Sequence, residues 1–233
     1  MENGKAYLAE LVGTFSLVFF GSMSVTVFAG ILGPLNGGGL VGIALAHGIV
    51  LMVAVYAYGK VSGAHINPAI TIAHIVAKKI EAGKGIVYIV MQLIGGAIAG
   101  VLQWFVLPEV GKATWYGLPQ LGDAVGKVAM SGMVTELALT MFLALSVYAV
   151  VSGKVPEDAA GLAIGGTLLL ALLIGGPLTG AALNPARHFG PAIASLLQGN
   201  NIFVHAEMWI VYWMGPIVGA LIGTFVYKLG MAD

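Results

Sequence analysis

Few side chains in this chain of 233 residues are able to bind or transfer anything. Two asparagines stand in the same tripeptide, Asn67-Pro68-Ala69 and Asn184-Pro185-Ala186, and Arg187 follows the second one directly. An amide both donates and accepts hydrogen bonds, whereas a guanidinium group only donates. These residues therefore indicate a narrow polar pathway rather than bond-making chemistry.

Enzymatic and metal chemistry find little support in the sequence. Because the chain contains no cysteine, it has no thiolate nucleophile, disulfide or thiolate metal ligand. No His-Glu-x-x-His motif and no convincing nucleophile and base pair occur. His74, His188 and His205 show no spacing that favours metal binding. We expect a protein that is not an enzyme and that has no catalytic residue, metal site or cofactor.

The composition is that of an integral membrane protein. Hydrophobic residues make up 59% and charged residues only 9%, against about 25% charged in soluble domains. Ten basic and ten acidic residues balance, so there is no basic field to bind nucleic acid. The 35 glycines, roughly twice the usual share, suit closely packed transmembrane helices.

Six stretches approach or exceed the roughly 20 residues that a membrane-spanning helix needs. They are about 6–31, 40–58, 86–107, 129–151, 159–176 and 208–229. Lysine and arginine remain preferentially on the cytoplasmic side during insertion. With both termini inside, seven lysines lie on that side: Lys5, Lys60, Lys78, Lys79, Lys84, Lys154 and Lys228. Lys112, Lys127 and Arg187 lie outside, and we expect a multi-pass protein of the cell membrane with cytoplasmic termini.

The chain repeats itself within a single channel domain, 1–233. Glu10 in the first span matches Glu136 in the fourth at an offset of 126 residues, and Asn67 matches Asn184 at 117. The glycine-containing run 96–100 matches 219–223 at an offset of 123. Repeats of about 5–107 and 129–229 each contain three spans, an odd number. The second must therefore enter the membrane from the opposite face, as an inverted repeat.

Each Asn-Pro-Ala tripeptide precedes an apolar segment that is too short to cross. Residues 68–79 and 185–197 reach only about 18 Å as helices. Asparagine caps a helix start and proline suits its first turn. We expect two re-entrant half-helices whose N-termini meet near the midplane, after irregular segments at 62–66 and 177–183 whose carbonyls line a lumen. The predicted fold is an all-α membrane protein with six spans and two half-helices.

The remaining buried polar residues allow more than one interpretation. Exposure of the charged Arg187 side chain to lipid would cost too much free energy, so this residue lines a pore or forms a structural ion pair. Glu10 and Glu136 either bind protons or cations, or brace the two loops through backbone N–H groups; their symmetric placement favours the brace. Gln92 and His65 are expected to support the same loops. His47 is either an interhelical hydrogen bonder or a lumen residue.

Four motifs make the chain similar to a known family. They are residues 9–14 (AELVGT), 62–69 (SGAHINPA), 184–187 (NPAR) and the pair Gly215-Pro216. The chain resembles the major intrinsic protein family, the aquaporins and glycerol facilitators, and within it the water channels of prokaryotic or archaeal type. The resemblance implies an aquaporin-like fold and a homotetramer in the lipid bilayer with one pore per protomer. It also implies that Asn67 and Asn184 donate hydrogen bonds to a passing water molecule.

The resemblance further implies an outer constriction, or selectivity filter, of four residues. By their spacing from the two motifs these are His47, Leu172, Ala181 and Arg187. The histidine at the first of these positions and the leucine at the second resemble the filter of plant vacuolar-membrane aquaporins more than the filter of strictly water-selective members. The residues at three further places differ from those typical of glycerol facilitators. They are His188, Ala192 and Tyr212-Trp213.

The expected function is therefore passive passage of water in single file, with ions and protons excluded. Carbonyls accept hydrogen bonds from the solute, while Asn67, Asn184 and Arg187 donate, with His47 as a further donor. Ions do not pass, because one line of ligands does not replace their hydration shell. The positive ends of the half-helices also repel cations, as in aquaporin-type pores generally. The alternatives are a broader facilitator for ammonia, glycerol or hydrogen peroxide, and an ion-coupled secondary transporter.

Overall fold

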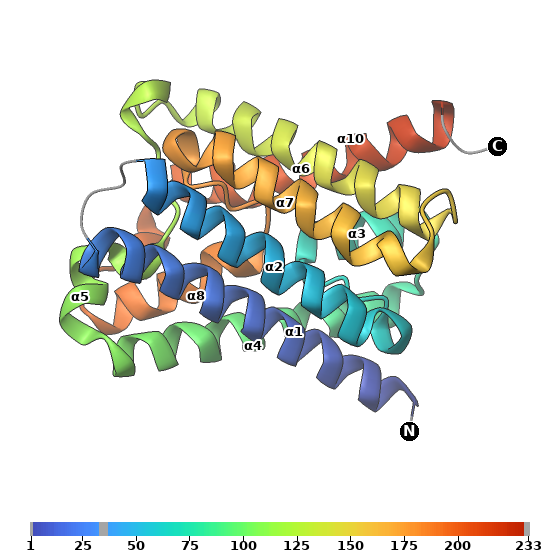
Figure 1. The fold of residues 1–233 in the computed structure, drawn as a ribbon, viewed down its shortest axis with the longest axis horizontal. Coiled ribbons are helices and arrows are strands. Elements are labelled where there is room, and N and C mark those ends of the chain that lie inside the picture. The colour runs from blue at the N-terminus through green and yellow to red at the C-terminus, as the bar shows by residue number, and fades with distance from the viewer. Residues whose placement is uncertain (1, 33–36, 231–233) are drawn as a thin grey trace.

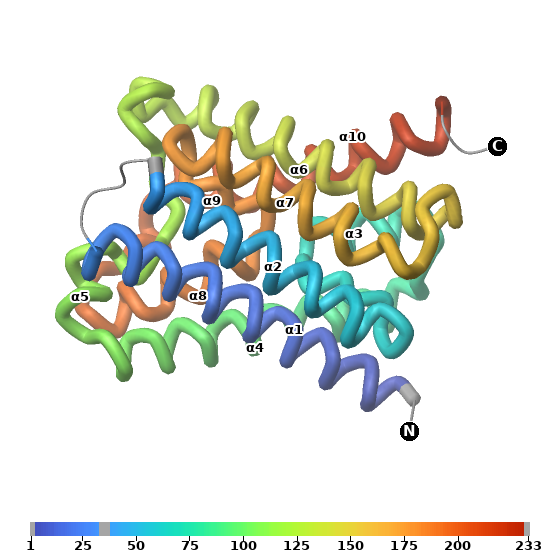
Figure 2. Tube along the Cα trace, in the orientation of Figure 1, coloured from blue at the N-terminus to red at the C-terminus, as the bar shows by residue number. Residues whose placement is uncertain are grey.

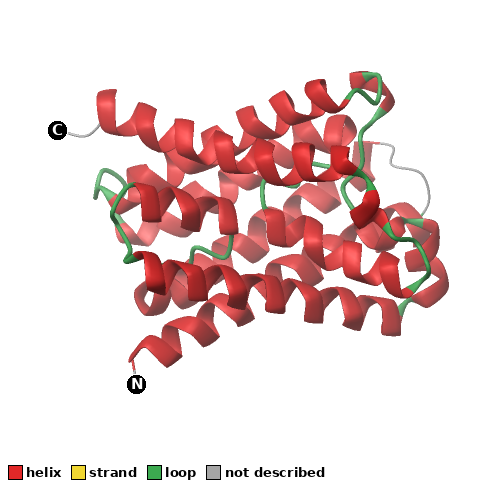
Figure 3. Ribbon diagram, turned by 180° about the vertical axis from the view of Figure 1, so that it is seen from behind, coloured by secondary structure: helices red, strands yellow, loops and turns green. Residues whose placement is uncertain are grey.

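The structure, a computed structural model, describes residues 2–32 and 37–230, so the ends of the expected domain 1–233 lie outside the described part. Six helices are long and apolar enough to cross a membrane, and they confirm the six predicted spans. They run over Asn3–Ile31, Gly38–Ser62, Ala82–Val106, Ala129–Val151, Glu157–Thr179 and Ala206–Gly230. The described residues contain no strand (Figure 3), which confirms the all-α fold class.

The long helices run side by side along one axis, with both chain ends at the same end of the bundle (Figure 1). The spans of the first half are α1 (Glu2–Val25), α2 (Gly37–Ser62) and α4 (Ala82–Val106), and those of the second are α6 (Ala129–Val151), α7 (Glu157–Thr179) and α10 (Gly215–Gly230). The short α5 (Pro108–Ala113) lies at the end opposite the termini. Large apolar side chains such as Phe20, Phe105 and Phe142 are exposed, as a lipid-facing surface requires.

Two short helices lie inside this bundle, as the sequence predicts. They are α3 (Pro68–Val76) and α8 (Pro185–Leu197), and Figure 2 shows α3 toward the end with the termini and α8 toward the other. The Asn67 side chain accepts a hydrogen bond from the Ala69 N–H at 2.9 Å, and Asn184 caps α8 in the same way. α3 ends at Val76, earlier than the predicted residue 79, because the chain turns at Lys78, whose φ is +58°.

The irregular segment before α8 is shorter than predicted. Pro177, Leu178 and Thr179 are helical and belong to α7, so the irregular backbone starts at Gly180. Pro177 has no N–H and removes one helical hydrogen bond, yet α7 continues past it for two residues. Gly180, with a φ of +79°, then ends the helix in the left-handed conformation that glycine adopts without strain.

Glycines bring the outer spans of each half into close backbone contact. A side chain at Gly95 would collide with the Leu11 carbonyl of α1, and one at Gly219 would collide with the Leu137 carbonyl of α6. The two glycines are 124 residues apart, and the leucines that they contact are 126 apart. The glycine runs predicted an offset of 123, so that register was wrong by one residue.

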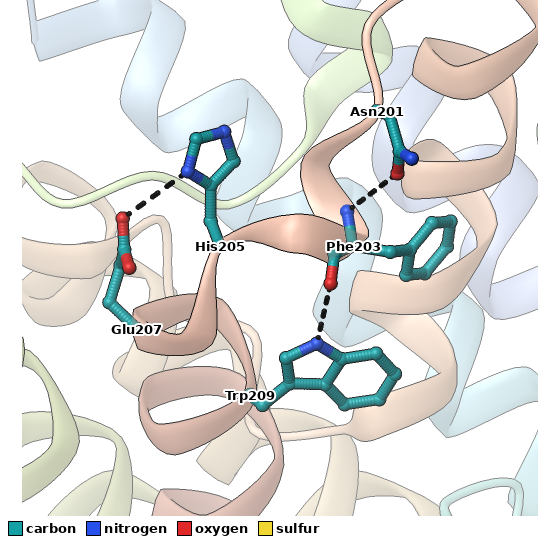
Figure 4. Close-up of polar contacts among 5 residues, drawn as sticks. All are labelled: Asn201, Phe203, His205, Glu207 and Trp209. Carbon is teal, nitrogen blue, oxygen red and sulfur yellow. Dashed lines mark hydrogen bonds and ion pairs between the residues drawn. The ribbon is translucent and has the colours of Figure 1, made fainter.

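The sixth span begins with a short helix and a wider turn. α9 (Ala206–Trp209) is followed by a π-helical turn, Ile210–Met214, before α10. Pro216 has no N–H to give to the Tyr212 carbonyl, which explains the wider turn at this place. Figure 4 shows how the preceding loop is held: Trp209 Nε1 donates to the Phe203 carbonyl at 3.0 Å, and His205 lies 3.6 Å from Glu207.

Candidate functional site

The N-termini of the two half-helices meet inside the bundle. Asn67 Nδ2 donates to the Leu183 carbonyl at 2.9 Å, and Asn184 Nδ2 donates to the Ile66 carbonyl at 2.9 Å. Each asparagine thus joins the cap of its own half-helix to the loop of the other. A side-chain amide has two N–H donors, so each keeps one N–H beyond this contact.

Both asparagines line a narrow cavity. Its polar groups come from His47, His65, Asn67, Asn184 and Arg187, and its apolar wall is formed by Leu17, Leu51, Ile70, Leu143, Val147, Ile164 and Leu168. The cavity adjoins a larger one, which also borders Lys60 and Glu157, and the two share Ala64, His65, Ile70, Val147 and Ile164. A cavity with few polar groups among many apolar ones suits a neutral solute and offers no full solvation shell to an ion.

The two loops before the half-helices have the same unusual backbone. In the first loop Gly63, Ala64 and Ile66 have φ values of +91°, +47° and +52°. In the second loop, 117 residues later in each case, Gly180, Ala181 and Leu183 have values of +79°, +45° and +53°. Non-glycine residues in this region cost about 1–2 kcal/mol each. Other groups must therefore hold each loop in place.

Glu10 holds the first loop. Its Oε1 accepts hydrogen bonds from the Ser62 hydroxyl at 2.6 Å and from the His65 N–H at 2.9 Å. Its Oε2 accepts from the Ile66 N–H at 2.6 Å and from Gln92 Nε2 at 2.8 Å. The carboxylate is completely buried and is absent from the cavity lining, so the geometry matches a brace rather than a cation site.

Glu136 holds the second loop by an equivalent set of contacts. Its Oε1 accepts from the Thr179 hydroxyl at 2.6 Å and the Ala182 N–H at 2.9 Å, and its Oε2 accepts from the Leu183 N–H at 2.8 Å. Glu136 is likewise fully buried.

Two tyrosines complete these braces. Tyr88 donates to the Ser62 carbonyl and Tyr212 to the Thr179 carbonyl, both at 2.9 Å. This pair was not predicted from the sequence, although a search at an offset of 124 residues would have found it.

Gln92 and His65 contact the first loop as expected. Gln92 Nε2 also donates to Thr71 Oγ1 at 2.9 Å, and His65 Nδ1 lies 3.1 Å from the same oxygen. Since Thr71 gives its own proton to the Asn67 carbonyl, His65 Nδ1 is the donor in this contact.

At the other end of the cavity, Arg187 is held by two acceptors. Its Nε donates to His47 Nε2 at 3.2 Å, and one terminal nitrogen donates to the Gly117 carbonyl at 2.8 Å. Arginine has five N–H donors, so these contacts leave donors for a solute. In the described residues the guanidinium group has no carboxylate within ion-pair distance, contrary to the ion-pair interpretation.

His47 does not have the donor role expected of it. Because its Nε2 accepts from Arg187, its Nδ1 carries the proton and donates to the Ile43 carbonyl at 2.9 Å. The histidine supports Arg187 and shapes the lumen. The Gly117 acceptor was not predicted either, because a backbone carbonyl leaves no mark in the sequence.

Leu172 and Ala181 do not line the cavity, although they pack beside residues that do. Both are 1% exposed and belong to one apolar cluster. Leu168, one helical turn before Leu172, lines the cavity instead. Leu172 and Ala181 thus remain predicted filter residues.

The other histidines have structural contacts. His188 stacks on Tyr212 with ring centres 4.9 Å apart, and its Nδ1 accepts from Trp213 Nε1 at 3.3 Å. Among the described residues no group of three or more acidic, histidine or cysteine side chains is placed to hold a metal ion.

Comparison with known proteins gives consistent results over almost the whole chain. The model of the family described as "Major intrinsic protein" matches residues 1–227. The chain is 36% identical over 233 residues to "Probable aquaporin TIP2-2" of Oryza sativa subsp. japonica, covering 96% of this chain and 86% of the relative. It is 33% identical over 229 residues to "Aquaporin Z" of Bradyrhizobium diazoefficiens, covering 96% and 92%.

A relative with a different name matches equally well. "Glycerol uptake facilitator protein-like 6" of Lactiplantibacillus plantarum is 35% identical over 225 residues, covering 97% of both chains. The solved structure of the aquaglyceroporin from Plasmodium falciparum superposes with a TM-score of 0.81 at 23% identity, covering 98% of this chain and 97% of that one. This likeness concerns the fold.

Proposed function

This chain belongs to the major intrinsic protein family, and on that basis we propose that it conducts mainly water in single file and excludes ions and protons. The family consists of passive channels for small neutral solutes in membranes, so the chain is a multi-pass membrane channel and not an enzyme. The observation that carries the proposal of water is the polar line in the cavity, which runs from His65 past the two asparagines to Arg187.

A water molecule that enters this line loses some of its hydrogen bonds to other water molecules. The polar groups of the cavity replace these hydrogen bonds. The free N–H of Asn67 and that of Asn184 donate hydrogen bonds to its oxygen, and loop carbonyls accept hydrogen bonds from its O–H groups. Because both asparagines are fixed by bonds to the opposite loop, their donors point in set directions. A water oxygen held by two donors has its own protons directed away from them, which interrupts proton transfer along the file.

Ions are excluded by the same geometry. Desolvation of a charge costs several kcal/mol or more, and the few polar groups of the cavity do not compensate for it. The N-termini of α3 and α8 carry positive partial charge and meet at the asparagines. Arg187 adds a full positive charge at the far end of the cavity, so cations meet two successive barriers, the general arrangement in aquaporin-type pores.

Stopped-flow light scattering of proteoliposomes tests the proposal. One shock uses an osmolyte that does not cross the membrane and reports water flux, while a second uses glycerol and reports glycerol flux. We expect fast shrinkage in the first and slow recovery in the second. Water flux equal to that of protein-free vesicles would overturn the proposal, and rapid glycerol flux would favour the broader facilitator.

We also propose a homotetramer in the cell membrane with both termini in the cytoplasm. The orientation is supported by the lysines, since Lys60, Lys154 and Lys228 lie in or next to the helix ends on the side of the termini. Cleavage of a terminal tag by protease in inside-out vesicles but not in intact cells is the expected result. Light scattering after size exclusion in detergent tests the tetramer.

A further inference from the structure

The outer loop that follows α4 contains a strained turn directly beside Arg187. Trp115, Tyr116 and Gly117 have φ values of +53°, +54° and +69°, so three successive residues lie in the left-handed region. Two of them carry side chains, and each costs about 1–2 kcal/mol in this conformation. The carbonyl at the end of the turn is the Gly117 oxygen that accepts from Arg187 at 2.8 Å.

Tyr116 fixes this turn in the protein. Its side chain is 1% exposed, and its ring lies so close to Gly111 that a side chain at that position would collide with it. Its hydroxyl lies 2.9 Å from the Pro108 carbonyl and 3.0 Å from Gln198 Oε1. The hydroxyl therefore connects the turn to the start of α5 and to a second helix.

Gln198 lies at the C-terminal end of α8, the half-helix whose first turn carries Arg187. Its Oε1 also accepts a hydrogen bond from Trp104 Nε1 of α4 at 3.0 Å. The turn is thus tied to both ends of α8, through Arg187 at the start and through Gln198 at the end. On its other side Gly117 contacts the backbone of Ser22 in α1, which leaves no room for movement toward that helix.

We propose that Tyr116 is a positioning residue of the filter: its hydroxyl holds the left-handed turn, and the turn holds the Arg187 guanidinium group at the lumen through the Gly117 carbonyl. This inference rests on the proposed filter role of Arg187. Tyr116 does not line the cavity, so it acts through Arg187 and not on the solute. Loss of the hydroxyl would let the guanidinium group move and would widen the constriction.

The test is the ratio of glycerol to water permeability in proteoliposomes. Tyr116→Phe keeps the buried ring and removes only the hydroxyl, and we expect the ratio to rise about fivefold, the scale set by one hydrogen bond. Gln198→Met removes the shared acceptor and should raise the ratio as well. Gln198→Glu keeps an acceptor oxygen, so its ratio of glycerol to water permeability should equal that of the unchanged protein.

Tyr227→Phe is the matched control. It also removes one hydroxyl from a buried ring, but that hydroxyl lies 2.6 Å from Ser152 Oγ at the end of the bundle with the termini. We expect its permeability ratio to equal that of the unchanged protein. An equal rise in Tyr227→Phe and Tyr116→Phe would overturn the inference, because it would reflect general loosening.

A double variant separates positioning from simple stabilisation. If Tyr116 acts through Arg187, Tyr116→Phe should change the ratio little once Arg187→Ala is present. A further rise of the same size in that background would contradict the inference.

The proposed function and this inference fail in different ways. If Arg187→Ala raises the ratio and Tyr116→Phe does not, the filter stands and the positioning role is wrong. If neither variant changes the ratio, the filter assignment itself is wrong, and so is the inference.

Discussion

The two re-entrant loops are built alike but bring different side chains to the cavity. In each, a fully buried glutamate accepts hydrogen bonds from two backbone N–H groups and one hydroxyl, and a tyrosine holds the carbonyl at the end of the preceding helix. Each loop then ends in an asparagine that bonds to the other loop. The support is therefore present twice.

The differences lie where the loops face the lumen. Arg187 in the second half corresponds to Ile70 in the first, and His65 in the first half corresponds to Ala182 in the second; all four line the cavity. One difference concerns support: Glu10 has Gln92 as a partner, and the equivalent position in α10 is Pro216. From this comparison we expect stability to depend mainly on the duplicated braces, and solute selection to depend mainly on the unmatched residues that line the cavity.

The largest expected effect comes from removing a duplicated residue. Glu136→Ala leaves the buried Ala182 and Leu183 N–H groups without an acceptor, and each unsatisfied N–H costs about 1–3 kcal/mol. We expect little or no folded channel, measured as monodisperse protein after detergent extraction. Glu207→Ala, at a partly exposed glutamate, is the control and should extract normally. A folded Glu136→Ala channel with full water flux would contradict the brace.

Removing an unmatched residue should change selection and leave the fold intact. Arg187→Ala deletes the charge and the largest side chain at that end of the cavity, so we expect the ratio of glycerol to water permeability to rise about tenfold, the scale of a hydrogen bond to a charged group. Ion leak, followed with a potential-sensitive dye, should rise as well. An unchanged ratio with normal folding would place the filter elsewhere.

His47→Phe should act on the same constriction in the opposite direction. The ring of His47 already touches Gly21, so a larger ring has to extend toward the lumen. We expect glycerol and ammonia flux to fall severalfold and water flux to fall less, measured by stopped flow on one preparation. Equal losses for all three solutes would speak against a filter role for this residue.

A smaller effect is expected where the two braces differ. Gln92→Met makes the first brace resemble the second by removing the amide that donates to Glu10 and Thr71. The free energy of unfolding should fall by about 1–3 kcal/mol, read as a lower melting temperature in detergent, while the permeability ratio stays constant. Gln120→Met, at an exposed glutamine, is the matched control. A changed ratio would mean that support and selection are not separate.

No effect is expected from thiol-specific mercury reagents. The chain contains no cysteine in either half, so nothing near the lumen forms a mercury–thiolate bond. Water flux before and after treatment, with and without a thiol reductant, checks this. Inhibition that a reductant reverses would be inconsistent with it.

The sequence predicts most of the scaffold because membrane insertion leaves strong local signals. Spans follow from apolar length, and the half-helices follow from Asn67 and Asn184 beside prolines. The precise loop start at Gly180 could not be predicted, because Pro177 signals a helix break, whereas α7 continues through it to Thr179. The Gly117 carbonyl and the proton position on His47 depend on tertiary contacts, which no local pattern encodes.

The temperature dependence of osmotic water permeability tests the central claim most directly. Water that passes in single file through a preformed polar line needs little activation, whereas water that dissolves in the bilayer must first lose all its hydrogen bonds. We predict that proteoliposomes show an activation energy near that of water self-diffusion and far below that of protein-free vesicles. An activation energy equal to that of the bare bilayer would contradict the account.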